Sequence, residues 1–87
     1  MSDSYFDRLD AIRERAGWKR IDYENYRHKS LPRWTFHVEE GPAYVFRVTG
    51  TDDAGHRVER REAQRSDDGN LALLEAARLD ALRATKP

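Results

Sequence analysis

The sequence has no cysteine, no net charge and no long apolar run, and each of these absences excludes a class of protein. Without cysteine there is neither a disulfide framework nor thiolate chemistry. Sixteen basic residues cancel sixteen acidic ones, so no overall field attracts the chain to nucleic acid or to an anionic membrane. No apolar run is long enough to span a membrane, and nothing resembles a signal peptide. We therefore expect a soluble, cytoplasmic protein that does not associate with membranes.

The sequence also lacks the patterns that accompany catalysis and metal binding. The serines have structural explanations as helix caps or loop residues, and the acids scatter over expected helix faces and turns. A chain of 87 residues leaves little room for a deep pocket beside its core. His28, His37 and His56 do not have the spacing His-x-x-x-His, so we interpret them as surface residues. The sequence predicts no catalytic, cofactor or metal site, and we expect no enzyme.

Residues 1–87 suit one domain with a modest core, centred on a hairpin. Large apolar residues alternate with polar ones on both sides of Gly41-Pro42, namely Trp34, Phe36 and Val38, then Tyr44, Phe46 and Val48. We predict strands at about 33–39 and 43–50. A three-residue loop, 40–42, would pair Phe36 with Phe46 and put all six side chains on one face. A two-residue loop would divide them between the faces.

The flanking segments predict a helix, a loop and a third strand. Residues 4–16 have one apolar stripe, with Ser4 as N-cap, Gly17 just beyond the end and Trp18 as a lid over the last turn. Residues 19–32 show no sustained period, and we expect a loop with an extended first half. Gly55 suits a bulged three-residue turn that would put Val58 on the face of Val48 and Ala63 opposite Val45. The strand that follows, 56–64, has the charges of a protected edge, although a helix is the alternative.

The last predicted element is a helix over 67–84, with Ser66 as N-cap. It has two apolar arcs, formed by Leu73, Leu74, Ala77, Ala81 and Ala84 and by Leu71, Ala72, Leu79 and Leu82. One arc would cover the sheet, and the other needs the first helix or a partner chain. A homodimer through this helix is therefore a further hypothesis. The expected fold is α+β, with the order α-β-β-β-α and both helices packed on one face of a three-stranded antiparallel sheet.

This layout resembles that of a double-stranded RNA-binding domain, and the turn Glu39-Glu40-Gly41-Pro42-Ala43-Tyr44 resembles that family's Gly-Pro-X-His turn. The resemblance implies RNA contacts from the first helix, from this turn and from a lysine-rich start of the second helix. Two positions depart from the family pattern. Tyr44 stands in place of the histidine, and Ser66-Asp67-Asp68 stands in place of the lysines. The resemblance thus implies a similar fold in which RNA binding is lost or rebuilt elsewhere.

The function that remains is binding. We expect a small non-enzymatic protein-interaction domain, such as an adaptor, an inhibitor or an accessory subunit, with a protein as its partner. One candidate surface is the second helix. The other is the outer face of the sheet, which would present Thr35, His37, Val45, Arg47, Glu59 and Arg61.

A nucleic-acid-binding function is the alternative. Segment 15–34 interleaves basic residues with Trp18, Tyr23, Tyr26 and Trp34, a pattern that can bind single strands by stacking and phosphate contact. The other interpretation is that Trp18 and Trp34 are core residues and that the charges form a solvated loop. Basic residues gathered on one face would favour nucleic acid, and scattered ones a protein partner. The candidate partner-binding residues are Lys19, Arg20, Arg27, Lys29, Arg33, Arg47 and Arg61.

Overall fold

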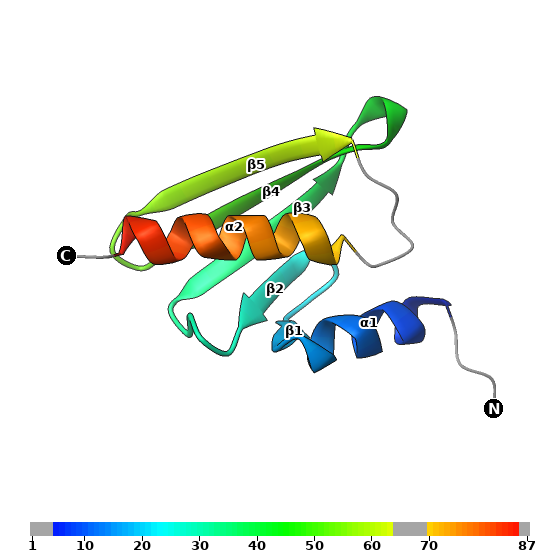
Figure 1. Cartoon of the computed structure of the whole chain (residues 1–87), viewed down its shortest axis with the longest axis horizontal. Helices are drawn as coiled ribbons and strands as arrows, with labels where there is room; N and C mark the ends of the chain where they lie inside the picture. The colour runs from blue at the N-terminus through cyan, green and yellow to red at the C-terminus, as the bar shows by residue number, and fades with distance from the viewer. Residues whose placement is uncertain (1–4, 64–69, 86–87) are drawn as a thin grey trace.

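Five antiparallel strands pair with their sequence neighbours, in the order β1-β2-β3-β4-β5. The computed structural model describes residues 5–63 and 70–85, and a helix lies at each end of that part of the chain (Figure 1). The elements are α1 (Tyr5–Arg15), β1 (Trp18–Arg20), β2 (Asn25–His28), β3 (Trp34–Glu40), β4 (Val45–Asp52), β5 (Arg57–Ala63) and α2 (Leu71–Ala84), with a 3-10 turn at Pro42–Tyr44. The proposed caps Ser4 and Ser66 lie outside the described residues.

The expected three-stranded sheet is wrong, because β1 and β2 occupy the segment where we expected a loop. Trp18 pairs with His28 and Arg20 with Tyr26, and Tyr26 pairs with Phe36 of β3. The two strands have only three and four residues, too few for a sustained alternation. In addition, one of the inward positions of β2 is the polar His28, which interrupts the apolar pattern.

His28 is buried because it joins this hairpin to the end of α1. The backbone N–H of Ser30 donates to Nδ1 at 3.0 Å, which leaves Nε2 to carry the proton and donate to the carbonyl of Ala16 at 2.8 Å. Gly17 takes a φ of +93° beside the ring, as expected of a residue just beyond a helix. A side chain at Gly17 would meet the imidazole, since its Cβ would lie 2.8 Å from Nε2.

The β3–β4 hairpin has the expected faces but not the expected register. Val38 lies opposite Val48, and Phe36 lies opposite Gly50 rather than Phe46. The turn is longer than we predicted, because Pro42–Tyr44 forms a 3-10 turn closed by the N–H of Gly41, which donates to the Val45 carbonyl at 2.7 Å. The register differs by an even number of residues, so five of the six predicted apolar side chains still point inward. Tyr44 lies in the 3-10 turn rather than in β4, and its side chain lies outside what is described.

The β4–β5 hairpin confirms the prediction in detail. Val45 pairs with Ala63, and Val58 pairs with Gly50 on the face of Val48. The turn is closed by the N–H of Asp52, which donates to the His56 carbonyl at 3.2 Å, and Gly55 adopts a φ of +92°. The segment is therefore a strand, and the helical alternative is wrong.

Helix α2 lies across one face of the sheet, which we call the inner face (Figure 1). Its buried residues, Leu73, Leu74, Ala77 and Ala81, pack in one cluster with Trp18, Trp34, Phe36 and Val48. Trp18 is thus a core residue rather than a lid, and its indole N–H donates to Glu75 of α2 at 2.8 Å. Leu71 and Leu82 also pack against this cluster, so the second apolar arc of α2 exposes only Ala72 and Leu79.

Helix α1 packs beside β1. Leu9 is buried, and the Arg13 guanidinium lies over the ring of Tyr26, 4.7 Å from its centroid. Asp10 pairs with Arg20 at 2.9 Å. Tyr26 and Arg20 both belong to the inner face, so the two helices contact the same side of the sheet.

Candidate interaction surface on the outer face of the sheet

The outer face of the sheet presents side chains that are exposed or half-buried in every described strand. Strand pairing arranges them in rows that run across the strands. One row consists of Lys19, Arg27, Thr35, Thr51 and Arg57. The next consists of Asn25, His37, Thr49 and Glu59, and a third of Glu39, Arg47 and Arg61. All six residues expected on this face, from Thr35 to Arg61, lie on it.

The β1–β2 end of this face gathers Lys19, Arg27, Lys29 and Arg33, which we call the basic corner. Lys19 lies directly opposite Arg27. Lys19, Arg27 and Lys29 line one hollow, which Arg20 also borders. Arg27 and Arg33 line a neighbouring hollow together with Asp52 and Asp53. All four side chains are exposed, and no carboxylate of the described residues forms an ion pair with any of them. Like charges on opposite residues repel, so the corner is a favourable place for a negative group from outside the chain.

Arg27 holds a fixed position within the basic corner. Its Nε donates to the carbonyl of Trp34 at 3.2 Å, and a terminal nitrogen donates to the Thr35 hydroxyl at 3.2 Å. Neither acceptor carries a full negative charge, so the guanidinium keeps its positive field. The side chains of Lys19, Lys29 and Arg33 make no hydrogen bond among the described residues and are free to adjust to a ligand.

Arg20 and three of the aromatic residues predicted for nucleic-acid binding are not part of the basic corner. Arg20 points to the inner face, where it pairs with Asp10 of α1. Trp18, Tyr26 and Trp34 expose only 1%, 6% and 2% of their surface, so they are core residues that cannot stack on bases. The interpretation of Trp18 and Trp34 as core is therefore confirmed. Tyr23 differs, since it is 79% exposed in the β1–β2 turn.

Carboxylates occupy the middle of the outer face. Nε2 of His37 lies 3.4 Å from Glu24 and 3.5 Å from Glu39, while its Nδ1 is 3.0 Å from the side-chain oxygen of Asn25. Glu39 accepts a hydrogen bond from Arg47 at 2.6 Å, which lowers the pKa of the Glu39 carboxyl. This part of the face thus carries both signs of charge at fixed positions.

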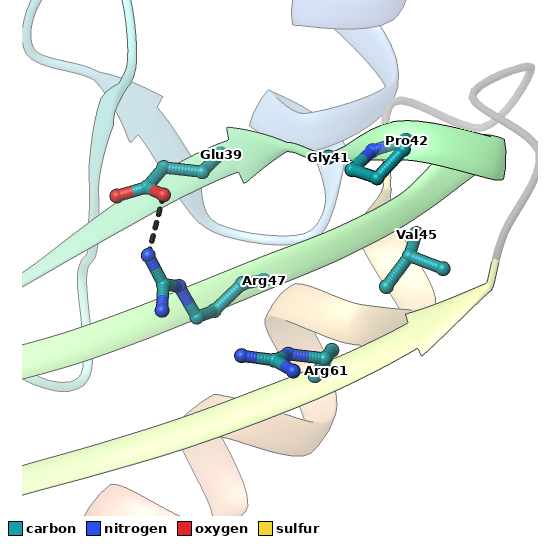
Figure 2. Close-up of a pocket in the computed structure, with 6 residues that line it drawn as sticks. All are labelled: Glu39, Gly41, Pro42, Val45, Arg47 and Arg61. Atoms are coloured by element: carbon teal, nitrogen blue, oxygen red, sulfur yellow. Dashed lines mark hydrogen bonds and ion pairs between the residues drawn. The ribbon is translucent and has the colours of Figure 1, made fainter.

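A shallow hollow of about 470 Å³ lies at the β3–β4 turn, lined by Glu39, Gly41, Pro42, Val45, Arg47 and Arg61. Figure 2 shows Arg61 beside Arg47 on the neighbouring strand, while the dashed line joins Arg47 to Glu39. Arg61 lies opposite Arg47 and has no ion-pair partner among the described residues. The predicted residues Arg47 and Arg61 therefore lie together, on the same face as the basic corner but at a separate place.

The histidines do not form a metal centre. Both ring nitrogens of His28 are used within the fold, and His56 Nδ1 lies 2.8 Å from Asp52 in the β4–β5 turn. Across residues 5–63 and 70–85, no group of three or more histidine, aspartate or glutamate side chains is placed to hold a metal ion. His28 corrects our interpretation of all three histidines as surface residues, since it is buried.

The sequence predicted the residues of the basic corner but not their arrangement. The arrangement depends on the β1–β2 pairing, and the only local signal for that pairing is the inward alternation of Tyr26 and His28 after the turn. Comparison with models of known families, with curated proteins and with solved structures found no match. Within the described part of the chain, neither helix has the length and apolar character needed to cross a membrane.

Proposed function

We propose that this chain is a small protein-interaction domain, acting as an adaptor, inhibitor or accessory subunit, that binds an acidic surface of another protein. The observation that carries the proposal is the basic corner, with its four exposed cations and no described carboxylate pairing with them. An acidic partner would relieve the repulsion between Lys19 and Arg27 and would gain charge-assisted hydrogen bonds.

The mixed charge beside the corner favours a protein over a polyanion. Glu24, Glu39 and Glu59 contribute negative charge to the outer face and would repel an extended phosphate backbone. A protein partner can instead match both signs at their fixed positions. Binding, rather than catalysis, accounts for an open face with shallow hollows, because catalysis needs reacting groups held in a cleft.

The test is capture of partners from a nuclease-treated lysate of the native cell, followed by mass spectrometry. The variant Lys19→Glu/Lys29→Glu reverses two corner charges whose side chains make no hydrogen bond in the described structure. The matched control Arg8→Glu/Arg15→Glu changes the net charge equally on exposed positions of α1. We expect the unaltered chain and the control to capture the same protein and the corner variant to lose it. Retention by the corner variant, or loss in both variants, would contradict the proposal.

Nucleic-acid binding is the second candidate, favoured by one observation. Four of the six lysine and arginine residues of segment 15–34 gather at one corner, beside the hydroxyls of Thr35 and Thr51. Because Trp18, Tyr26 and Trp34 are buried, this binding would rest on phosphate contacts with little sequence preference. The relation to double-stranded RNA-binding domains stays a prediction, and the side chain of Tyr44 and residues 66–68 lie outside what is described.

Titration of labelled duplex RNA and single strands over a series of salt concentrations tests this candidate. If each of the four corner cations contacts a phosphate, log K for duplex binding should fall with log salt at a slope of about −3.6. Lys19→Glu/Lys29→Glu should reduce that slope to about −1.8 or less. No binding at low salt would eliminate nucleic acid as the ligand and leave the protein partner.

A further inference from the structure

Strand β5 forms an edge of the sheet, and its outward side pairs with no other described strand (Figure 1). The two edges of the sheet differ. β1 has three residues and is packed beside α1, whereas β5 has seven residues in regular pairing with β4. A regular edge of this length is a template for another strand unless its side chains prevent pairing.

Hydrogen bonding to β4 determines which backbone groups of β5 point outward. The N–H of Asp52 donates to the carbonyl of His56, so residues 52 and 56 form a hydrogen-bonded pair. The alternation of an antiparallel ladder then directs the backbone groups of Val58, Arg60 and Glu62 toward β4. The N–H and C=O groups of Arg57, Glu59, Arg61 and Ala63 consequently point away from the sheet. The side chains of these four residues lie on the outer face of the sheet, perpendicular to the direction of their N–H and C=O groups.

Only a few registers let two copies of this edge pair antiparallel about a two-fold axis. Outward-pointing residues must meet one another, so a register that pairs most of the seven-residue strand has Glu59, Arg60 or Arg61 on the axis. With Glu59 on the axis, two glutamates face each other and Arg57 faces Arg61 of the partner. With Arg61 on the axis, two arginines face each other. Glu59 accepts a hydrogen bond from Arg57 of its own strand at 3.0 Å. With Arg60 on the axis, the same Glu59 also faces Arg61 of the other copy, so both Glu59–Arg61 pairs are attractive.

We propose that two copies of this chain pair through β5, with Arg60 opposite Arg60 on the two-fold axis, and form one continuous ten-stranded sheet. The charges of β5 then have two effects. They oppose the wrong registers, as edge charges do, and they favour this one. This pairing does not depend on the proposed function, because the basic corner lies at the β1–β2 end of the sheet.

The inner face of the strand is compatible with this register. Two arginines meet on the axis, but each Arg60 already donates two hydrogen bonds to Asp80 of its own α2, at 2.6 Å and 3.0 Å. The carboxylate neutralises each guanidinium before the second copy arrives, and the contact with Arg60 lowers the pKa of Asp80. The two arginine–aspartate pairs would therefore approach each other as neutral units. By contrast, α2 offers little apolar surface for a dimer, since only Ala72 and Leu79 of its second arc are exposed.

Sedimentation equilibrium of the full chain over a wide concentration series tests the proposal. The unaltered chain should show a monomer–dimer equilibrium. Glu59→Arg or Arg61→Glu should each raise the dimer dissociation constant about tenfold, because two attractive pairs become repulsive. Circular dichroism of each variant shows whether the monomer keeps its fold.

Chains with exchanged charges distinguish this interface from other possible dimer interfaces, because they should regain dimerisation only if residues 59 and 61 face each other. An equimolar mixture of the Glu59→Arg and Arg61→Glu chains should form a heterodimer, since both pairs between positions 59 and 61 are then attractive. The double variant Glu59→Arg/Arg61→Glu should dimerise with itself for the same reason. Leu79→Glu should leave the dissociation constant unchanged. The proposal fails if the unaltered chain is a monomer throughout, if Leu79→Glu abolishes the dimer, or if the mixture stays monomeric.

Discussion

The two faces of this sheet depend on strand register to different degrees. The inner face keeps its composition under any shift by an even number of residues, because side chains alternate along a strand. The charge arrangement of the outer face depends on which residues lie opposite each other, such as Glu39 and Arg47, which form an ion pair. In the register expected from a three-residue loop, Arg47 would instead lie opposite Thr35, and this ion pair would not form. Burial therefore specifies which side of the sheet is apolar, while the turns specify which charges meet.

The largest loss of stability should come from truncating a buried side chain of the inner face. Phe36 is fully buried and packs edge-on against Trp18, with ring centroids 5.1 Å apart. Phe36→Ala should lower the free energy of unfolding by about 3–5 kcal/mol, through lost burial and the cavity left behind. Urea denaturation measures it. The control Arg33→Ala, at the exposed end of the outer face, should change stability by about 0.5 kcal/mol or less. Equal losses in the two variants would remove the distinction between the faces.

Gly50 tests the register itself. It lies opposite Phe36, and a Cβ at this position would be 2.7 Å from a carbon of the phenyl ring. We expect Gly50→Ala to cost about 1–3 kcal/mol of stability through overpacking. In a Phe36→Leu background the same substitution should cost less, because the smaller side chain leaves room. Additive effects in this double-mutant cycle would mean that the two residues are not opposite each other.

Loss of the Arg60–Asp80 contact between β5 and α2 should lower the free energy of unfolding by a smaller amount, and this amount should depend on pH. The hydrogen bonds from Arg60 lower the pKa of Asp80 below its unfolded value. Asp80 therefore contributes stability that is complete above its unfolded pKa, near 4, and is lost as the pH falls through its lower folded pKa. Asp80→Asn should destabilise the protein less than Gly50→Ala does. It should also flatten the fall in stability below about pH 4, measured by urea denaturation at several pH values. An unchanged pH profile would count against this contact.

The smallest effect should be a gain in stability on the outer face. Lys19 lies directly opposite Arg27, so Lys19→Glu replaces a repulsive pair with an attractive one. We expect the free energy of unfolding to rise by about 0.2–1 kcal/mol, while binding to an acidic partner weakens. Thermal unfolding and partner capture on the same preparation check both parts. A destabilised variant would show that the two side chains do not face each other.

The sequence predicted those parts of the fold that depend on local alternation or on a single turn residue. Gly55 was enough to predict the β4–β5 register, and the inward faces of β3 and β4 followed from their apolar residues. The β3–β4 register could not be predicted, because the 3-10 turn after Gly41 leaves no signal beyond a common Gly-Pro pair. The strands β1 and β2 were missed because they are short and carry the inward-facing His28.

Strand pairing also determines which parts of the candidate site could be predicted from the sequence. The residues of the basic corner were recognised from composition alone. Their grouping, and the separation of Arg20 from them, required the pairing of β1 with β2. The Arg47–Arg61 hollow similarly required knowledge of the turn that shapes it. Side-chain chemistry can be read from a single sequence, whereas adjacency across strands depends on long-range pairing.

The pairing of β1 with β2 creates the basic corner beside a sheet of defined register. A cross-strand nuclear Overhauser map of the full chain tests this most directly, because non-hydrogen-bonded antiparallel pairs bring their Hα atoms close together. We predict Hα–Hα contacts between Arg20 and Tyr26, and between Val38 and Val48. An Hα–Hα contact between Phe36 and Phe46, with none between Arg20 and Tyr26, would contradict the account.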